Sequence, residues 1–418
     1  MNAEHRAFYP TEILLPGPEV QPETWACVAC DQYTSQPEYW EKVETLVGTR
    51  PSTLRLMLPE CYLKEGEEKI PRIHETMAAY LDQGVLKPAV ANGFVLCERT
   101  TPSGTRLGLV GAVDLEEYDY VAGVYPLIRP TEQTIAERLP ARLKIRRGAP
   151  VELSHILILV DDPERTVLEP LRARKDQLRR LYDFDLMLNG GHLAGYAVED
   201  EGDLAKVEKA LDRLREKQGE NPMLLAVGDG NHSLATAKAR WNEIRETLSP
   251  AERERHPARF ALCEIENIHD PALKFEPIHR LVTGTSPEEL YDCWEKYCES
   301  RGMVLAEEGE GHTFQMVIRR DEYPVVVQKP EGMIPCETIQ LFLDEFLYTH
   351  PEASIDYIHG AAALRQLAQN RRSVGFLLPE ISKKTFFDNV KTLGVLPRKT
   401  FSMGEADEKR FYMECRRI

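Results

Sequence analysis

Apolar and polar residues alternate differently in successive parts of the chain, and the first part is rich in proline and short apolar runs. A helical spacing of apolar residues appears there only around 67–81. Two strand-like apolar runs follow at 93–99 and 107–114, with the turn-forming residues 101–105 between them. This pattern predicts a β-hairpin.

The middle of the chain alternates between the helical and the strand pattern. A continuous apolar run at 154–162 predicts a buried strand, and helices are expected at 169–181 and 203–218. A short apolar strand is predicted at 223–227, followed by a helix that begins near 231. This alternation is typical of α/β domains.

The last third mixes both patterns. A hairpin is predicted over 313–328, and strands at 373–379 and 410–416. Helices are expected at 337–347, 355–369 and 382–393.

The fold class predicted from these patterns is mixed α/β, with α+β regions on either side of a central core. No linker-like composition separates the regions. We expect an N-terminal α+β region over 1–124, a core over 125–285 and a C-terminal α+β region over 286–418.

Composition narrows the classes of partner. The 418 residues carry a net charge of −16, which makes binding to nucleic acid or to an anionic membrane unlikely. The N-terminus lacks a signal-peptide pattern, and no run reaches the roughly 18 apolar residues of a membrane span. The nine scattered cysteines fit reduced thiols in a cytoplasmic protein.

The most specific chemical pattern is an apolar strand that ends in Gly228, Asp229 and Gly230 and turns into a helix at Asn231. Glycines let a ligand approach the backbone, and a helix N-terminus attracts phosphate. Asp229 could bind a divalent cation or a substrate hydroxyl, and His232 could bind phosphate or transfer a proton. Alternatively, Asp229 or Asn231 only caps the helix and His232 lies on the surface.

Other patterns leave a functional and a structural interpretation open. Cys27 and Cys30 form a CxxC that lacks a second ligand pair, so structural thiols are favoured over zinc or redox chemistry. His279 and Arg280 follow a strand pattern and could contact an anion or simply stabilise the fold. Lys399, with its neighbours, could reach a phosphate or lie in solvent.

A helix is predicted to begin at 135 and to kink or end at Pro140. Arg129 precedes it, Arg138 lies within it and Arg142 follows the proline, and all three add positive charge. They could face a phosphate, although a solvated helix face is the more common arrangement for such residues.

Five segments carry a family resemblance, namely 25–34, 129–134, 228–232, 276–280 and 396–400. Together they resemble a bacterial family described as a domain of unknown function and related to the free serine kinases. The turn after Gly228 resembles the Asp-Gly-His-His-Arg signature of the ParB-like nucleotide-binding proteins. That superfamily includes sulfiredoxin, the ParB partition proteins and the ADP- or ATP-dependent free serine kinases.

The resemblance implies a ParB-like nucleotide-binding core and a role for particular residues. Thr131 and Glu132 match the His-Glu pair of the serine kinases, which makes Glu132 the implied catalytic base. Asp229 and His232 match the acidic residue and the second histidine of the signature, and Asp229 is the implied metal ligand. Asn231 and Ser233 stand where the signature has its first histidine and its arginine. The implied nucleotide- or phosphate-binding residues are Gly228, Gly230, Asn231, Ser233, Arg129, His279, Arg280 and Lys399.

The resulting hypothesis is a small-molecule kinase that uses ADP or ATP with Mg²⁺ on a hydroxyl of a small metabolite. Such a site needs charge neutralisation and alignment more than covalent chemistry. The alternatives are a nucleotide-binding or nucleotide-hydrolysing regulator of the ParB type and a hydrolase of a phosphorylated metabolite.

Overall fold

The computed structural model describes residues 6–121, 123–134, 139–153, 156–219 and 221–418. The chain forms two compact units. Unit 1 comprises Met1–Lys274 and Gly404–Ile418, and unit 2 comprises Phe275–Met403. Both units combine helices with β-sheet, so the predicted mixed α/β class is confirmed.

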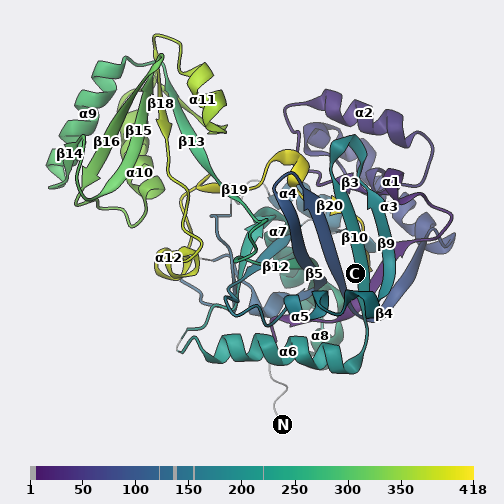
Figure 1. Cartoon of the computed structure of the whole chain (residues 1–418). Helices are drawn as coiled ribbons and strands as arrows, with labels where there is room; N and C mark the ends of the chain where they lie inside the picture. Colours follow the sequence, from purple (N-terminus) through teal and green to yellow (C-terminus); the bar gives the residue numbers. More distant parts are fainter. Residues whose placement is uncertain (1–5, 122, 135–138, 154–155, 220) are drawn as a thin grey trace. The chain divides into compact units, whose positions relative to one another are not determined.

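Unit 1 is built on a large, mostly antiparallel sheet (Figure 1). The strand order in this sheet is β6-β11-β8-β12-β5-β4-β2-β21-β7. The predicted hairpin is confirmed, because β4 and β5 pair antiparallel with Val95 opposite Val110. Strands β1, β9 and β10 extend the sheet, while β3 and β20 form a separate pair. The strands of unit 1 are β1 (Phe8–Tyr9), β2 (Thr11–Pro16), β3 (Cys27–Val28), β4 (Leu86–Thr101), β5 (Gly104–Asp114), β6 (Ile128–Arg129), β7 (Val151–Leu153), β8 (Leu157–Val160), β9 (Arg179–Asp185), β10 (His192–Val198), β11 (Leu225–Asp229), β12 (Phe260–Asn267), β20 (Phe411–Tyr412) and β21 (Cys415–Arg417).

The helices of unit 1 pack against this sheet through two clusters of buried apolar side chains. One cluster contains Trp25 and the other contains Trp241. Helix α6 buries Val207, Leu211 and Leu214, as its helical spacing predicted. The helices and 3-10 turns of unit 1 are α1 (Pro22–Trp25), α2 (Pro37–Val47), η1 (Thr53–Arg55), η2 (Glu60–Glu65), α3 (Gly66–Asp82), η3 (Leu115–Glu117), α4 (Leu139–Arg146), α5 (Glu169–Arg172), η5 (Lys175–Gln177), η6 (Met187–Asn189), α6 (Glu201–Glu216), α7 (Asn231–Arg245), α8 (Pro250–Arg255), η7 (Pro257–Arg259) and η8 (Ala406–Glu408).

The C-terminal segment completes unit 1. Strand β20 pairs with β3, and β21 lies between β2 and β7 in the large sheet. The last residues of the chain therefore lie beside N-terminal elements, which Figure 1 shows as yellow segments near purple ones. Strands from the expected regions 1–124 and 125–285 also share this sheet, and the three-region division stays a prediction.

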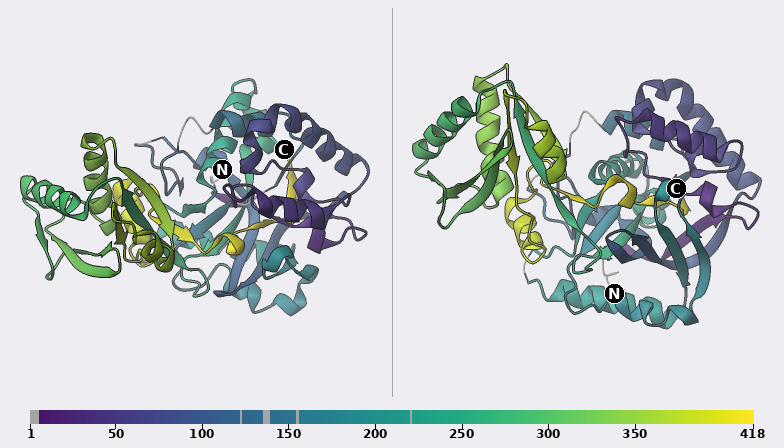
Figure 2. Two further views of the ribbon diagram at one scale, coloured as in Figure 1. Left: turned by 90° about the horizontal axis from the view of Figure 1, so that it is seen from above. Right: turned by 45° about the horizontal axis from the view of Figure 1, so that its top comes forward.

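Unit 2 has a sheet of its own with the order β14-β16-β15-β18-β13-β17, and β19 pairs with one end of β13. Neighbouring residues of β18 point to opposite faces: Phe376 contacts Trp294 of α9, and Leu377 joins the apolar cluster of α11. Helices thus cover both faces, which Figure 2 shows from two further directions. The elements are β13 (Phe275–Thr283), α9 (Pro287–Ser300), β14 (Val304–Ala306), β15 (His312–Ile318), β16 (Asp321–Gln328), α10 (Pro335–Thr349), β17 (Ser354–His359), α11 (Ala361–Leu367), β18 (Ser373–Leu377), α12 (Phe386–Leu393) and β19 (Phe401–Met403).

Two predicted helices are wrong over part of their length. The helix expected at 169–181 ends at Arg172, and β9 starts at Arg179 because it pairs with β10. The helix expected at 355–369 begins only at Ala361, because Ser354–His359 pairs with β13 as β17. In both places, strand pairing overrides a local helical tendency.

Candidate functional site

The predicted strand–turn–helix is present in unit 1. Strand β11 ends at Asp229, Gly230 adopts a left-handed conformation with φ 83°, and α7 begins at Asn231. A Cβ atom at residue 230 would lie 3.2 Å from Ile156, so the turn needs glycine for both conformation and space. Asn231 is therefore the first residue of the helix and not its cap.

Asn231 binds the segment that carries Glu132. Strand β6 runs parallel to β11, so both strands leave the sheet at the same edge. The backbone N–H of Thr131 donates to Asn231 Oδ1 at 3.1 Å, and Asn231 Nδ2 donates to Thr131 Oγ1 at 3.3 Å. Thr131 Oγ1 in turn donates to the Val227 carbonyl at 2.5 Å. Three hydrogen bonds thus hold residues 131–132 beside the start of α7, and Glu132 itself is half-buried.

Asp229 forms an ion pair that the sequence did not predict. Its Oδ1 accepts from the Gly230 N–H at 2.8 Å, and its Oδ2 lies 2.9 Å from Nζ of Lys409. The two residues are 180 positions apart in the chain. No local pattern marks Lys409, because its neighbours in sequence are also charged.

A pocket of about 140 Å³ adjoins this turn. Ser233 and Thr236 of α7 line it together with Ile156, the residue that contacts the turn at Gly230. Its polar wall comes from Arg142 and Arg146 of α4, which form ion pairs with Glu60 and Glu152, and from Tyr412. Burial would raise the pKa of the Glu152 carboxyl, but Arg416 and Arg146 hold this pKa below its ordinary value.

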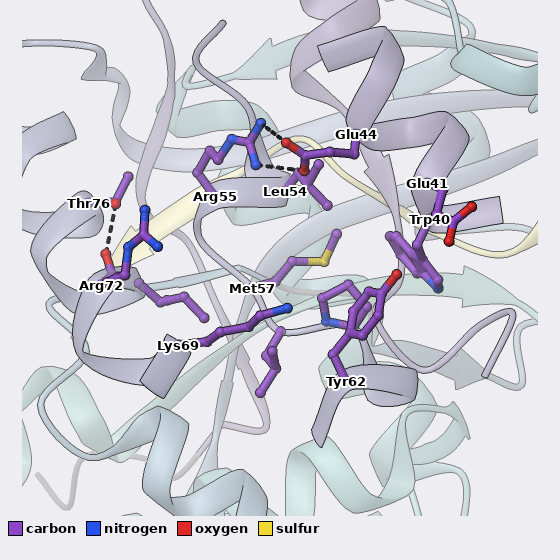
Figure 3. A pocket seen from close by; sticks show the side chains of 13 residues that line it. Trp40, Glu41, Glu44, Leu54, Arg55, Met57, Tyr62, Lys69, Arg72 and Thr76 are labelled. Atoms are coloured by element: carbon purple, nitrogen blue, oxygen red, sulfur yellow. Dashed lines mark hydrogen bonds and ion pairs between the residues drawn. The ribbon is translucent and has the colours of Figure 1, made fainter. Parts of the chain in front are cut away.

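A larger pocket of about 530 Å³ lies between α2, α3 and the 3-10 turns η1 and η2 (Figure 3). Lys69 points across it to the ring of Tyr62, with Nζ 4.3 Å from the ring centre. Met57 and Leu58 line both this larger pocket and the smaller one. None of the predicted site residues lines the larger pocket.

Arg129 and His232 lie at different places relative to the turn at Asp229. The Arg129 guanidinium contacts residues that precede β6 and β11, whereas His232 directly follows the turn. The guanidinium of Arg129 donates to the carbonyls of Pro126 and Asn221, which precede β6 and β11, whereas Asp229 is at the end of β11. His232 and Ser233 lie in the first turn of α7, and both are half-buried. Arg138 lies outside the described residues.

Three predicted residues belong to unit 2. His279 is 4% exposed and accepts a hydrogen bond on Nδ1 from the Leu378 N–H at 3.2 Å. Arg280 is completely buried and donates to the carbonyls of Ile278, Arg398 and Lys399. The Lys399 side chain is exposed. Arg280 thus stabilises the segment that carries Lys399.

Both CxxC cysteines are free thiols, of which Cys27 is buried and Cys30 is half-buried. Burial raises the pKa of Cys30 to about 12, and the Tyr412 hydroxyl donates to its sulfur at 3.1 Å. Cys27 Sγ lies 3.3 Å from Ser52 Oγ. Within the described residues, no group of three or more His, Cys, Asp or Glu side chains could hold a metal ion.

None of the helices that the structure describes is both long enough and apolar enough to cross a membrane.

Comparisons with known proteins give distant likenesses and one family. A glutamate-to-alanine mutant of free serine kinase in complex with AMP is 12% identical, with a TM-score of 0.41 over 73% of this chain and 90% of that chain. The same kind of mutant in complex with ADP is 13% identical, with a TM-score of 0.40 over 73% and 91%. C-terminally truncated SbnI from Staphylococcus aureus is 10% identical, with a TM-score of 0.38 over 71% and 82%.

At these TM-scores and identities, the likeness fixes neither the chemistry nor the substrate of this chain. No curated protein matches the sequence. A family model described as "Protein of unknown function (DUF1015)" matches residues 14–346, so the chain belongs to this family, as its sequence resemblance predicted.

Proposed function

We propose that the protein transfers a phosphoryl group from ADP or ATP to a hydroxyl of a small metabolite, at the turn formed by residues 228–233. The observation that carries the proposal is the set of hydrogen bonds between Thr131 and Asn231. These bonds hold the segment of Glu132 at the N-terminus of α7, where a phosphate would bind. A carboxylate and a phosphate site are the two parts that such a reaction needs at close range.

The nucleotide side of the site is the start of α7. The N-terminus of a helix carries partial positive charge and presents backbone N–H groups to an anion. Gly230 gives the turn its left-handed conformation, while His232 and Ser233 in the first turn of α7 offer side-chain contacts. In this proposal the turn is the phosphate-binding part of a ParB-like core.

Mg²⁺ fits this site as a partner of the nucleotide. Protein sites usually bind Mg²⁺ through one or two carboxylates together with substrate phosphates. Asp229 supplies one carboxylate, and a dedicated cluster of ligands is missing from the described residues. When bound, the ion would neutralise charge on the phosphates.

The acceptor would occupy the pocket beside Ser233 and Thr236. Its volume of about 140 Å³ suits a small acceptor. The hydroxyl oxygen of the acceptor would form a bond to the terminal phosphorus of the nucleotide. Glu132 would accept the proton that this hydroxyl loses. The bond from that phosphorus to the bridging oxygen breaks, and the nucleotide leaves with one phosphate fewer.

Replacing the proposed base tests this assignment. Glu132→Gln should lower phosphotransfer by about 10²–10⁴-fold and leave nucleotide affinity nearly unchanged, because the amide keeps the shape but cannot accept the proton. Product formation would be followed by mass spectrometry with ATP or ADP, Mg²⁺ and a panel of hydroxylated metabolites that includes L-serine. Calorimetry would give the nucleotide affinity.

The control is Glu201→Gln, which alters an exposed carboxylate in the first turn of α6. Full phosphotransfer by Glu132→Gln would contradict the role of Glu132. Nucleotide binding without any phosphorylated product would instead indicate a regulator, and release of phosphate from a phosphorylated metabolite would indicate a hydrolase.

A further inference from the structure

The positive charges near the proposed phosphate site are almost all committed to other partners. On α7, Lys238 Nζ donates to the Leu115 carbonyl at 2.7 Å, and Arg240 forms an ion pair with Glu243 at 2.9 Å. Arg142 pairs with Glu60, and Arg129 donates to backbone carbonyls. Among the described residues, Lys409 is the cation that lies on the carboxylate of the turn.

Two buried ion pairs of β12 lie near the Lys409–Asp229 pair, because Glu266 interacts electrostatically with Asp229 and Arg410 follows Lys409 in the chain. Arg106 pairs with Glu266 at 2.8 Å, and Arg410 pairs with Glu264. The side chains of these two pairs are at most 6% exposed. In the third pair, Lys409 is 10% and Asp229 is 24% exposed. The Lys409–Asp229 pair is therefore the one that solvent, or a ligand, can reach.

Hydrogen bonds from other elements hold the backbone around Lys409 in place. Arg99 donates to the Asp407 carbonyl and Arg106 to the Glu408 carbonyl, both at 2.9 Å. The Ala29 N–H donates to the Arg410 carbonyl at 3.0 Å, next to the β20–β3 pairing. Lysine is a compact charge on a flexible stem, so its ammonium group can move while the backbone stays fixed.

Electrostatics gives a reason for such an exchange. A phosphate that approaches Asp229 meets a carboxylate of the same sign, and repulsion between like charges is strong in a partly buried site. A cation must therefore stand between the two. Lys409 already neutralises Asp229, and lysine is a common phosphate ligand in proteins.

We propose that Lys409 is a phosphate-binding residue of the nucleotide site, which exchanges Asp229 for a phosphate oxygen when a divalent cation binds to Asp229. The proposal rests on the proposed function, because it requires a nucleotide at this turn.

The exchange predicts two effects of opposite direction for Lys409→Met, which keeps the length and removes the charge. ADP affinity measured with Mg²⁺ should fall by about 10- to 100-fold, the loss of one charge-assisted hydrogen bond. The affinity for Mn²⁺ alone should rise, because the Lys409 ammonium group no longer competes with the metal for Asp229. A purely structural role would lower both affinities together with the melting temperature.

Calorimetry with ADP and Mg²⁺, and electron paramagnetic resonance with Mn²⁺ alone, measure the two effects in the full chain. The control is Lys217→Met, which removes an exposed lysine paired with Glu164. The double variant Lys409→Met/Asp229→Asn removes both charges of the ion pair, and it should fold while losing the gain in Mn²⁺ affinity.

The outcomes separate the two proposals. Failure of the unaltered protein to bind ADP overturns the proposed nucleotide site. Binding of ADP that Lys409→Met retains at full affinity overturns only the role of Lys409, as does a parallel loss of ADP and Mn²⁺ affinity.

Discussion

Asp229 and Arg280 were both candidate ligand-binding residues in the sequence, and the structure gives them different surroundings. In unit 2, the guanidinium of Arg280 is completely buried and its donors are used by backbone carbonyls and by Gln340. In unit 1, Asp229 keeps 24% of its side chain exposed beside a pocket and a helix N-terminus. A buried charge that satisfies its own fold stabilises that fold, whereas an accessible ion pair can exchange partners.

The two histidines show the same contrast. His232 is half-buried in the first turn of α7. His279 is enclosed in unit 2, where burial and the nearby charge of Arg280 lower its pKa to about 4. His279 is therefore neutral at pH 7, and its Nδ1 acts as an acceptor for the Leu378 N–H.

The largest expected effect comes from removing the guanidinium of unit 2. Arg280→Met should lower the free energy of unfolding of unit 2 by at least about 3 kcal/mol, because three backbone carbonyls, one buried and two partly buried, lose their donor. Hydrogen exchange in β13, β17 and β18 would report the loss. The control is Arg320→Met, an exposed residue between β15 and β16. A stable Arg280→Met protein with lost ADP affinity would reverse the comparison and make Arg280 a ligand-binding residue.

A somewhat smaller effect should follow from pH through His279. Its pKa is about 4 in the folded chain, below the ordinary value of about 6.5. Between these values the unfolded state binds a proton that the folded state does not, so stability falls as pH drops from about 6.5 to 4, by up to about 3 kcal/mol.

Denaturation with urea at several pH values would measure this dependence. His279→Gln should flatten it, because glutamine can accept the Leu378 N–H but does not titrate. Equal slopes for the two proteins would show that His279 does not cause the dependence.

The smallest expected effect concerns the turn itself. Gly230→Ala forces a Cβ into a left-handed conformation at a cost of about 1–2 kcal/mol and brings it to 3.2 Å from Ile156. Gly219→Ala is the matched control, because Gly219 has φ 67° and, apart from its chain neighbours, no described residue comes within 4 Å of its added Cβ. Urea denaturation should show a slightly larger loss for Gly230→Ala, and only this variant should lower ADP affinity. Equal losses and unchanged affinity would argue against a ligand near this turn.

Local patterns in the sequence were sufficient for several elements. The spacing of Leu234, Ala237 and Trp241 predicted α7, and these residues are buried on one face of that helix. The two glycines and Asp229 predicted the turn that precedes it. Such features depend on residues a few positions apart, which the chain brings together without its tertiary fold.

The tertiary structure decided the partners of the charged side chains. Asn231 holds Thr131 from 100 positions away, and Lys409 reaches Asp229 from 180 positions away. Likewise, β17 replaced the start of a predicted helix because β13 lies beside it. Spacing along a chain defines faces and turns, whereas the partner of a charge depends on which distant segment folds against it, and no local pattern contains that information.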